Sequence, residues 1–324
     1  MIDFIILIAG LALVLAGANF LVDGASAIAK RFGMSDFIIG MTIVGIGTSS
    51  PEMVVSFLSA IEGNADIAVG NVVGSNLFNT LVIMGITAII TPVALTSNNI
   101  KKDIPFSLLA AFIVFTLGLG TVIDGAVENI ITRVHGVMLL AMFGIFMAYT
   151  IYSSSTSSGK EEQTQQQTSK APKNIWISIL MVVGGLAGLI WGGDLFVSSA
   201  CAIAKSLGVS DTVIALTILA TGTSLPELAS SSVAAFKKNT DLALGNVLGS
   251  NISNIFLILG GSSLIHPLSM KNITMLDTSM LVISSLLLFI CAFTFKKKQL
   301  DRIEGVILTV LYISFVTYLI LNTV

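Results

Sequence analysis

The sequence predicts an all-helical integral membrane protein whose ten transmembrane helices form two inverted five-helix repeats. Three observations support this prediction. The 324 residues are 54% hydrophobic and 10% charged, with a mean hydropathy of +0.95, whereas soluble domains are about one quarter charged. Long apolar runs alternate with short polar clusters, which is typical of a polytopic membrane protein. A long internal repeat divides the chain into two related halves.

Ten apolar runs are long enough, at roughly 20 residues each, to cross a bilayer. They lie at 2–22, 37–60, 67–90, 104–123, 130–151, 175–197, 212–235, 242–265, 276–295 and 303–321. The first run has no basic leader and no A-x-A-like cleavage site. It is therefore interpreted as a retained helix, ending near the polar Asn19 and Asp23, and not as a secretory signal.

The chain is expected to have three parts. Residues 1–152 form the first five-helix repeat, with the N-terminus outside, and residues 175–324 form the second, inverted repeat. Between them, residues 153–174 are rich in Ser, Gln, Thr and Lys and have no apolar face. This composition predicts a disordered linker. A tether is the expected role, and a regulatory segment is the alternative.

Basic residues are distributed unequally between the two sides of the predicted topology. About 13 follow odd-numbered spans, whereas the other side holds only Arg133, Lys205 and Lys271. Under the positive-inside rule this bias places the linker in the cytoplasm and both termini outside. The expected location is the cell inner (plasma) membrane, crossed several times.

The repeat relates residues 40–85 to residues 215–260 without a gap. About 20 of these 46 positions are identical, and the offset is a constant 175 residues. Each half contains an odd number of spans, so the second copy must enter the membrane from the opposite side. Such inverted halves are the architecture of many secondary transporters, with the substrate site at the midplane between them.

A polar motif lies in the middle of one apolar span in each repeat. Gly47-Thr48-Ser49-Ser50-Pro51-Glu52 recurs as Gly222-Thr223-Ser224-Leu225-Pro226-Glu227. A carboxylate at this depth costs at least ~2.5–3.5 kcal/mol, so it is expected to face a cavity, a cation or a polar partner. The glycine and proline predict a broken helix with freed backbone carbonyls, which are tolerated only where they line a cavity or are buried in protein.

A second motif follows in the next span of each repeat. Gly70-Asn71-Val-Val-Gly74-Ser75-Asn76-Leu-Phe-Asn79 recurs as Gly245-Asn246-Val-Leu-Gly249-Ser250-Asn251-Ile-Ser-Asn254. The helical spacing of these residues predicts one small, polar face. Together the motifs supply two carboxylates, four hydroxyls and several amides, and no histidine or thiolate. These hard oxygen ligands suit Ca²⁺ and Na⁺. Ions that compete for the same oxygens exclude one another, which is the physical basis of antiport.

Other polar and small residues have simpler interpretations. The glycine faces suit helix packing as well as a site, and Asn71 and Asn246 are left open between the site and the scaffold. The remaining expectations are helix N-caps for Asp66 and Asp241, solvated helix ends for Asn19, Asp23 and Asp194, small apolar roles for Cys201 and Cys291, and incidental positions for His135 and His266.

The doubled motifs resemble the α-repeats of the cation/calcium exchanger superfamily, in its prokaryotic Na⁺/Ca²⁺ antiporter branch, over nearly the whole chain. The resemblance implies four adjoining cation sites and alternating access by sliding of the first and sixth helices. It also implies that both glutamates ligate Ca²⁺, helped by the backbone oxygens of Thr48 and Thr223. The implied site residues are Thr48, Ser49, Glu52, Thr223, Ser224 and Glu227, with Ser75, Asn79, Ser250 and Asn254.

Two positions depart from the family pattern. Ser50 stands where the family has an apolar residue, and it is expected to face away from the site. Asn254 stands where some members carry an aspartate. The amide removes one ionisable group, which leaves proton coupling and the ion count open.

The expected function is Na⁺/Ca²⁺ antiport at a site built from the two GTSxPE motifs. Ca²⁺/H⁺ exchange and K⁺-assisted exchange are the alternatives within transport, and a cation channel or membrane sensor is the alternative from another class. No enzyme is expected, because the sequence contains no nucleophile–base pair and no cofactor motif. The expected partners are the lipid bilayer and the ions Ca²⁺ and Na⁺, with no cofactor and no nucleic acid. A monomer is the working expectation, with the oligomeric state left open.

Overall fold

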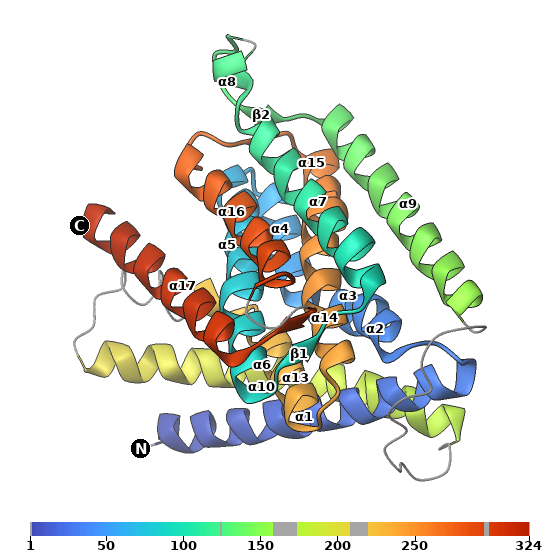
Figure 1. Cartoon of the computed structure of the whole chain (residues 1–324). Coiled ribbons are helices and arrows are strands. Elements are labelled where there is room, and N and C mark those ends of the chain that lie inside the picture. The colour runs from blue at the N-terminus through green and yellow to red at the C-terminus, as the bar shows by residue number, and fades with distance from the viewer. Residues whose placement is uncertain (1, 124, 158–173, 208–219, 295–297, 324) are drawn as a thin grey trace.

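The computed structural model describes residues 2–123, 125–157, 174–207, 220–294 and 298–323 (Figure 1). The first half contains α1 (Ile2–Phe32), α2 (Asp36–Ile39), η1 (Gly40–Val44), α3 (Gly45–Thr48), α4 (Ser50–Ile61), α5 (Ala65–Phe78), η2 (Asn79–Ile83), α6 (Met84–Ile90), η3 (Asn99–Asp103), α7 (Ile104–Leu117), α8 (Gly120–Ile123) and α9 (Arg133–Ser157). The second half contains α10 (Ile175–Ser206), α12 (Ala220–Gly222), α13 (Leu225–Phe236), α14 (Thr240–Ser253), η5 (Asn254–Leu259), α15 (Gly260–Ile265), α16 (Met275–Cys291) and α17 (Arg302–Thr323). Elements labelled η are π-helical turns.

Six of the described helical segments are long and apolar enough to cross a membrane. A seventh candidate is the pair Asp36–Thr48 and Ser50–Ile61, which bends by 45° at Ser49. The chain is therefore a helical membrane protein that crosses the bilayer several times. The runs at 104–123 and 276–295 form shorter helices than expected, α7 and α16. Residues 212–219 of the run at 212–235, and most of the 153–174 linker, lie outside the described residues.

In the motif-bearing part of each half, the helix boundaries repeat with the same offset of 175 residues as the sequence. α4 and α13 occupy equivalent positions, as do α5 and α14, and the π-helical turns η2 and η5 both start at an asparagine. The centre of the molecule consists of α5–α6 and α14–α15, whose residues are mostly buried. The two motif-bearing segments of each half therefore lie in or against the core.

Glycines bring α14 unusually close to the segment that carries the first GTSxPE motif. A Cβ atom on Gly245 would lie 2.2 Å from the Phe37 carbonyl oxygen, and one on Gly249 would lie 2.2 Å from the Met41 carbonyl oxygen. Real Cβ contacts do not reach such distances, so these positions require glycine. The structure thus gives these two glycines a packing role between the halves.

α1 and α10 pack against each other along their lengths and run across the lower edge of Figure 1, at a steep angle to α7 and α9. Both helices were expected to end earlier, near residues 22 and 197, but they continue to Phe32 and Ser206. Their contact is lined with glycine on both sides. A Cβ atom on Gly17 would lie 2.8 Å from the Gly185 carbonyl oxygen, and one on Gly192 would lie 2.8 Å from the Val14 backbone nitrogen.

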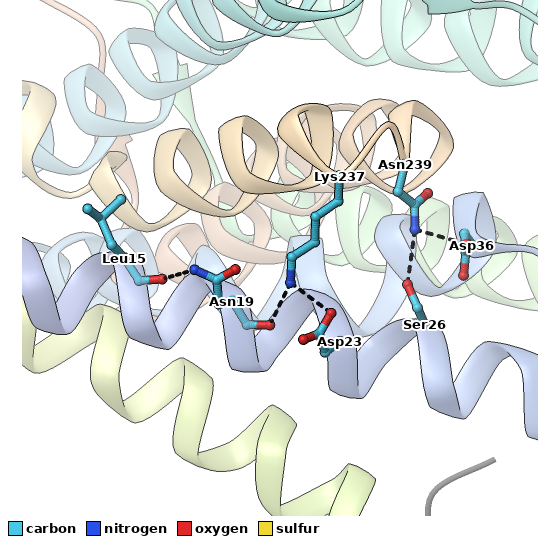
Figure 2. Close-up of polar contacts among 7 residues, drawn as sticks. All are labelled: Leu15, Asn19, Asp23, Ser26, Asp36, Lys237 and Asn239. Atoms are coloured by element: carbon cyan, nitrogen blue, oxygen red, sulfur yellow. Dashed lines mark hydrogen bonds and ion pairs between the residues drawn. The ribbon is translucent and has the colours of Figure 1, made fainter. Parts of the chain in front are cut away.

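The expected polar end of the first helix is instead a polar contact in the middle of α1 (Figure 2). Lys237, at the end of α13, forms an ion pair of 2.7 Å with Asp23 and also donates to the Asn19 carbonyl oxygen. Asn239 donates to Ser26 and to Asp36 at 3.0 and 2.9 Å. The placement of Asn19 and Asp23 at a helix end was therefore wrong, although both residues are exposed as expected. These residues attach α1 to the α13–α14 loop of the other half.

The loops of the two halves meet in two separate groups. One group includes the antiparallel pairing of β1 (Val93–Ala94) with β4 (Gln299–Leu300). The other includes the pairing of β2 (Ile130–Ile131) with β3 (Leu268–Ser269). In the predicted topology the first group lies entirely after odd-numbered spans and the second after even-numbered spans. Every one of these contacts therefore joins loops assigned to the same side of the membrane.

Candidate functional site

Both GTSxPE motifs interrupt their helices, as the sequence predicts. Ser49 separates α3 from α4 with φ −77° and ψ 9°, and Ser224 precedes α13 with φ −87° and ψ 9°. Pro51 and Pro226 occupy the first turn of the helix that follows, where a missing N–H costs little. The Gly47 carbonyl would normally bond to the N–H of residue 51, and the Ser50 hydroxyl donates to it instead at 2.6 Å.

The two glutamates are joined to the opposite repeats by reciprocal hydrogen bonds. The Ser49 hydroxyl donates to Glu227 Oε1 at 2.9 Å, and the Ser224 hydroxyl donates to Glu52 Oε1 at 2.8 Å. Both glutamates are completely buried. In each case the hydroxyl of one motif orients the carboxylate of the other. The expected convergence of one acidic side chain from each half is therefore present in the structure.

The remaining hydroxyls surround the glutamates less symmetrically. Ser75 donates to Glu52 Oε1 at 3.4 Å, whereas its repeat equivalent Ser250 donates to the Gly45 carbonyl oxygen at 3.1 Å. Thr48 and Thr223 donate to amide oxygens of the opposite repeat, Thr48 to Asn246 at 3.2 Å and Thr223 to Asn71 at 3.5 Å.

The two expected asparagine ligands each start a π-helical turn, Asn79 in η2 and Asn254 in η5. Such turns are rare and frequently mark functional sites. Neither amide atom of Asn79 has a hydrogen-bond partner among the described residues, although the side chain is fully buried. Asn254 donates to the Asn76 amide oxygen at 3.0 Å, and its own Oδ1 is unpartnered. Neither side chain forms a hydrogen bond with a described glutamate.

Asn71 and Asn246, whose roles the sequence left open, form hydrogen bonds with the helices that carry the glutamates. Asn71 donates to the Glu52 carbonyl oxygen at 3.1 Å and to Ser56 at 3.0 Å. Asn246 donates to the Glu227 carbonyl oxygen, and to Ser230 and Ser231 at 3.0 and 2.8 Å. Each asparagine thus joins the helix that carries the glutamate of its own repeat to a threonine of the other repeat.

A second amide network crosses between the repeats and was not predicted. Asn76 donates to the Asn251 carbonyl oxygen at 3.2 Å, and Asn251 donates to Thr80 at 2.8 Å. Both asparagines are buried. Their recurrence at the 175-residue offset is the signal that could have identified them as a pair. The repeat could not identify Thr80 as the partner of Asn251, because the equivalent residue in the second copy has no hydroxyl.

The electrostatic balance of the site favours a cation. No lysine, arginine or histidine in the described part of the chain forms an ion pair with Glu52 or Glu227. One oxygen of each carboxylate, Oε2, is buried and has no hydrogen-bond partner among the described residues. The Oδ1 atoms of Asn79 and Asn254 are likewise buried and have no hydrogen-bond partner among the described residues. Buried oxygens without donors are costly unless another group satisfies them, and a bound metal cation would do so.

The helix N-caps differ from those that the sequence predicted. The N-caps of α5 and α14 are Asn64 and Asn239, so the expectation that Asp66 and Asp241 cap these helices was wrong by two residues. Asp66, in the first turn of α5, instead accepts a hydrogen bond of 2.7 Å from the Asn272 side chain of the other half.

Comparison with known proteins places the chain in a family. The sequence model of the family described as "Sodium/calcium exchanger protein" matches residues 2–152 and 177–321. The sodium/calcium exchanger MaX1 of Methanosarcina acetivorans is 32% identical over 98% of both chains. The inner membrane protein YrbG of Escherichia coli is 33% identical over 81% of this chain and 79% of its own. A solved structure of the sodium-calcium exchanger NCX_Mj superimposes with a TM-score of 0.82 at 32% identity, covering 98% of each chain.

These relatives are transporters and not enzymes. The family match covers most of the chain, and the structural match extends over nearly all of it. The chain therefore belongs to the sodium/calcium exchanger protein family, in the prokaryotic part of the cation/calcium exchanger superfamily.

Proposed function

We propose that this protein is a secondary active antiporter that exchanges Ca²⁺ for Na⁺ at a site built from its two GTSxPE motifs. The observation that carries the proposal is the reciprocal pair of hydrogen bonds, Ser49 to Glu227 and Ser224 to Glu52. It holds two buried carboxylates between the halves and leaves one oxygen of each without a donor. The proposed ligands are Glu52, Glu227, Thr48, Thr223, Ser49, Ser224, Asn79, Asn254, Ser75 and Ser250.

The chemistry of these groups explains why exchange would be coupled. Two buried carboxylates repel each other unless their charge is neutralised. One Ca²⁺ neutralises both, and so do two Na⁺. Ca²⁺ takes six to eight oxygen ligands at ~2.3–2.6 Å, and Na⁺ accepts the same hard oxygens. Because the two kinds of ion need the same carboxylate oxygens, occupancy by one excludes the other.

The proposed topology has ten transmembrane helices in two inverted repeats, 1–152 and 175–324. Both termini lie outside the cytoplasm and the 153–174 linker lies inside, in the inner membrane of the cell. The two separate groups of loop contacts support this arrangement, since each group joins only loops assigned to one side. The excess of basic residues after odd-numbered spans supports the orientation.

Alternating access would require one part of the protein to move relative to the rest. α1 and α10 form a tightly packed pair through their glycines, which suits movement as one unit. We propose that this pair slides across the core helices, so that the site opens to one side and then to the other. The polar contacts between α1 and the α13–α14 loop would break and reform during that movement.

Proteoliposomes loaded with Na⁺ and diluted into Na⁺-free buffer test the ion coupling. Radioactive Ca²⁺ should accumulate only when the outward Na⁺ gradient is present, and Glu52→Gln or Glu227→Gln should abolish the uptake. Uptake that follows a pH gradient and ignores Na⁺ would establish Ca²⁺/H⁺ exchange. Uptake that also requires K⁺ would establish K⁺-assisted exchange. Passive Ca²⁺ flux without any counter-ion would establish a channel.

A further inference from the structure

A pocket of about 280 Å³ lies away from the ion site, where the loop before α7 meets the loop after α16. It combines cationic and apolar side chains, and none of the described residues that line it carries a carboxylate. The residues that line it are Ser97, Ile100, Lys101, Ala292, Phe293 and Lys298. A pocket with this lining offers positive charge at one part of its wall and hydrocarbon contact at another.

The fold holds the two loops of this pocket together. β1 pairs with β4, the Leu95 N–H donates to the Lys298 carbonyl oxygen at 2.8 Å, and the Lys298 N–H donates to the Ala292 carbonyl oxygen at 2.9 Å. Lys298 has φ +61°, a backbone conformation that favours glycine. Its Nζ donates to the Ser97 hydroxyl at 3.2 Å, across the pocket wall.

The lysines of the pocket are available for an anion. Neither Lys101 nor Lys298 forms an ion pair with a carboxylate in the described part of the chain. Phe293, on the apolar wall, is 57% exposed. The pocket lies where α7 begins and α16 ends. These helix ends mark the boundary of the apolar spans, which is the depth of the lipid head groups.

We propose that this pocket binds an anionic phospholipid. The lipid phosphate would lie between Lys101 and Lys298, with the Ser97 hydroxyl as a further donor, in charge-assisted hydrogen bonds. The upper part of an acyl chain would lie against Phe293. Basic pockets between transmembrane helices on the cytoplasmic side bind anionic head groups in this way. The inference rests on the proposed topology for its side of the membrane and not on which ions are exchanged.

The repeat supplies an internal comparison. Lys101 corresponds to Leu276 at the 175-residue offset. Lys298 corresponds to Asn129, because the Lys298 carbonyl accepts from the Leu95 N–H as the Asn129 carbonyl accepts from the Met270 N–H, both at 2.8 Å. Neither corresponding residue is basic. The architecture of the repeat therefore does not require lysines here. They occur only on the side where the positive-inside rule places the cytoplasmic leaflet, which carries the anionic lipids.

The test measures phospholipid binding to the purified full-length protein in detergent by native mass spectrometry. The probes are phosphatidylglycerol, phosphatidylcholine and inorganic phosphate. The wild-type protein should retain phosphatidylglycerol in preference to phosphatidylcholine, and Lys101→Gln/Lys298→Gln should lose about tenfold or more of that affinity. Lys271→Gln, on the opposite side, should bind as wild type. Thermal unfolding of each variant verifies that it is folded.

Three results would overturn the proposal. One is a double variant that binds phosphatidylglycerol as tightly as wild type, and another is a wild type that binds both lipids equally. Alternatively, inorganic phosphate could displace the lipid at equal concentration, which would show a site for a soluble anion. Each result is independent of the Na⁺-driven Ca²⁺ uptake, so failure here and failure of the proposed exchange are distinguishable.

Discussion

Ser49 and Glu227 are 178 residues apart in the sequence, and a hydrogen bond of 2.9 Å joins them at the centre of the molecule. The equivalent bond from Ser224 to Glu52 measures 2.8 Å. Each carboxylate is therefore oriented by the opposite half of the chain. If the two halves shift relative to each other, both carboxylates must lose or change a ligand. This relationship links the geometry of the ion site to the relative position of the repeats.

Ser49→Ala and Ser224→Ala should therefore each weaken Ca²⁺ binding by about tenfold, because a hydrogen bond to a charged group contributes ~1.5–3 kcal/mol. The near-identical distances predict effects of similar size for the two variants. The measurement is the Ca²⁺ concentration that gives half-maximal uptake into proteoliposomes. Ser253→Ala is the control, since Ser253 is buried but donates only to the Ser250 carbonyl oxygen of its own helix. Unchanged affinity in both test variants would contradict the proposed role of these hydroxyls.

Asn246→Ala should destabilise the protein more than Asn71→Ala. Asn246 is fully buried and its two amide N–H groups have three acceptors within hydrogen-bond distance, whereas Asn71 is half-buried and has two. Each buried group left without a partner costs ~1–3 kcal/mol, so we expect a loss of about 3 kcal/mol for Asn246→Ala and about 1 kcal/mol for Asn71→Ala. Thermal unfolding in detergent measures the difference. Equal losses would show that the second repeat does not depend more strongly on its asparagine.

Ser50 has a role that the family pattern did not indicate. Its hydroxyl donates to the Gly47 carbonyl, the group that Pro51 leaves without an N–H. Ser50→Leu, which copies the second repeat, should lower the free energy of unfolding by about 1 kcal/mol. In the second repeat Leu225 packs against a core cluster, so both Leu225→Ser and Leu225→Ala lose apolar contact. Leu225→Ser should nevertheless be the more stable of the two in thermal unfolding, because it offers a donor to the equivalent Gly222 carbonyl. Equal stability of these two variants, or no loss in Ser50→Leu, would contradict this explanation.

Much of the fold was predictable because both the apolar runs and the repeat are local or periodic signals. The helix breaks at Ser49 and Ser224 followed from proline and glycine chemistry, and the convergence of Glu52 and Glu227 followed from the repeat. The length of α1 was not predictable in the same way. Asn19 and Asp23 looked like a helix end because their partner, Lys237, lies more than 200 residues away. Local polarity could not show that a loop of the other half satisfies them.

The finer details of the site depend on contacts that sequence identity does not determine. Ser75 and Ser250 occupy identical motif positions, yet only Ser75 contacts a glutamate. The π-helical turns at Asn79 and Asn254 also left no sequence pattern, since α- and π-helical turns share the same apolar composition. Only the recurrence of asparagine at the 175-residue offset marked these positions.

The ion pair between Asp23 and Lys237 should contribute little to stability. Both side chains are substantially exposed, at 50% and 32%, and exposed pairs typically contribute ~0.2–1 kcal/mol. Asp23→Asn should therefore change the free energy of unfolding by less than about 1 kcal/mol, and less still at high salt. Thermal unfolding at two ionic strengths measures this. A large loss that persists in high salt would show that Asp23 acts through more than its charge.

The glycine contact between α1 and α10 should be far more sensitive than the ion pair. A Cβ atom on Gly17 would lie 2.8 Å from the Gly185 carbonyl oxygen, so Gly17→Ala forces the two helices apart. Overpacking of this kind costs ~1–3 kcal/mol. Gly184→Ala, on α10, is the matched control because a Cβ there meets no atom within 4 Å, and alanine is the better helix former. The unfolding temperature should fall for Gly17→Ala and stay the same or rise for Gly184→Ala. If both variants behaved alike, close approach of α1 and α10 would not be what requires glycine, and the case for their movement as one unit would lose its structural basis.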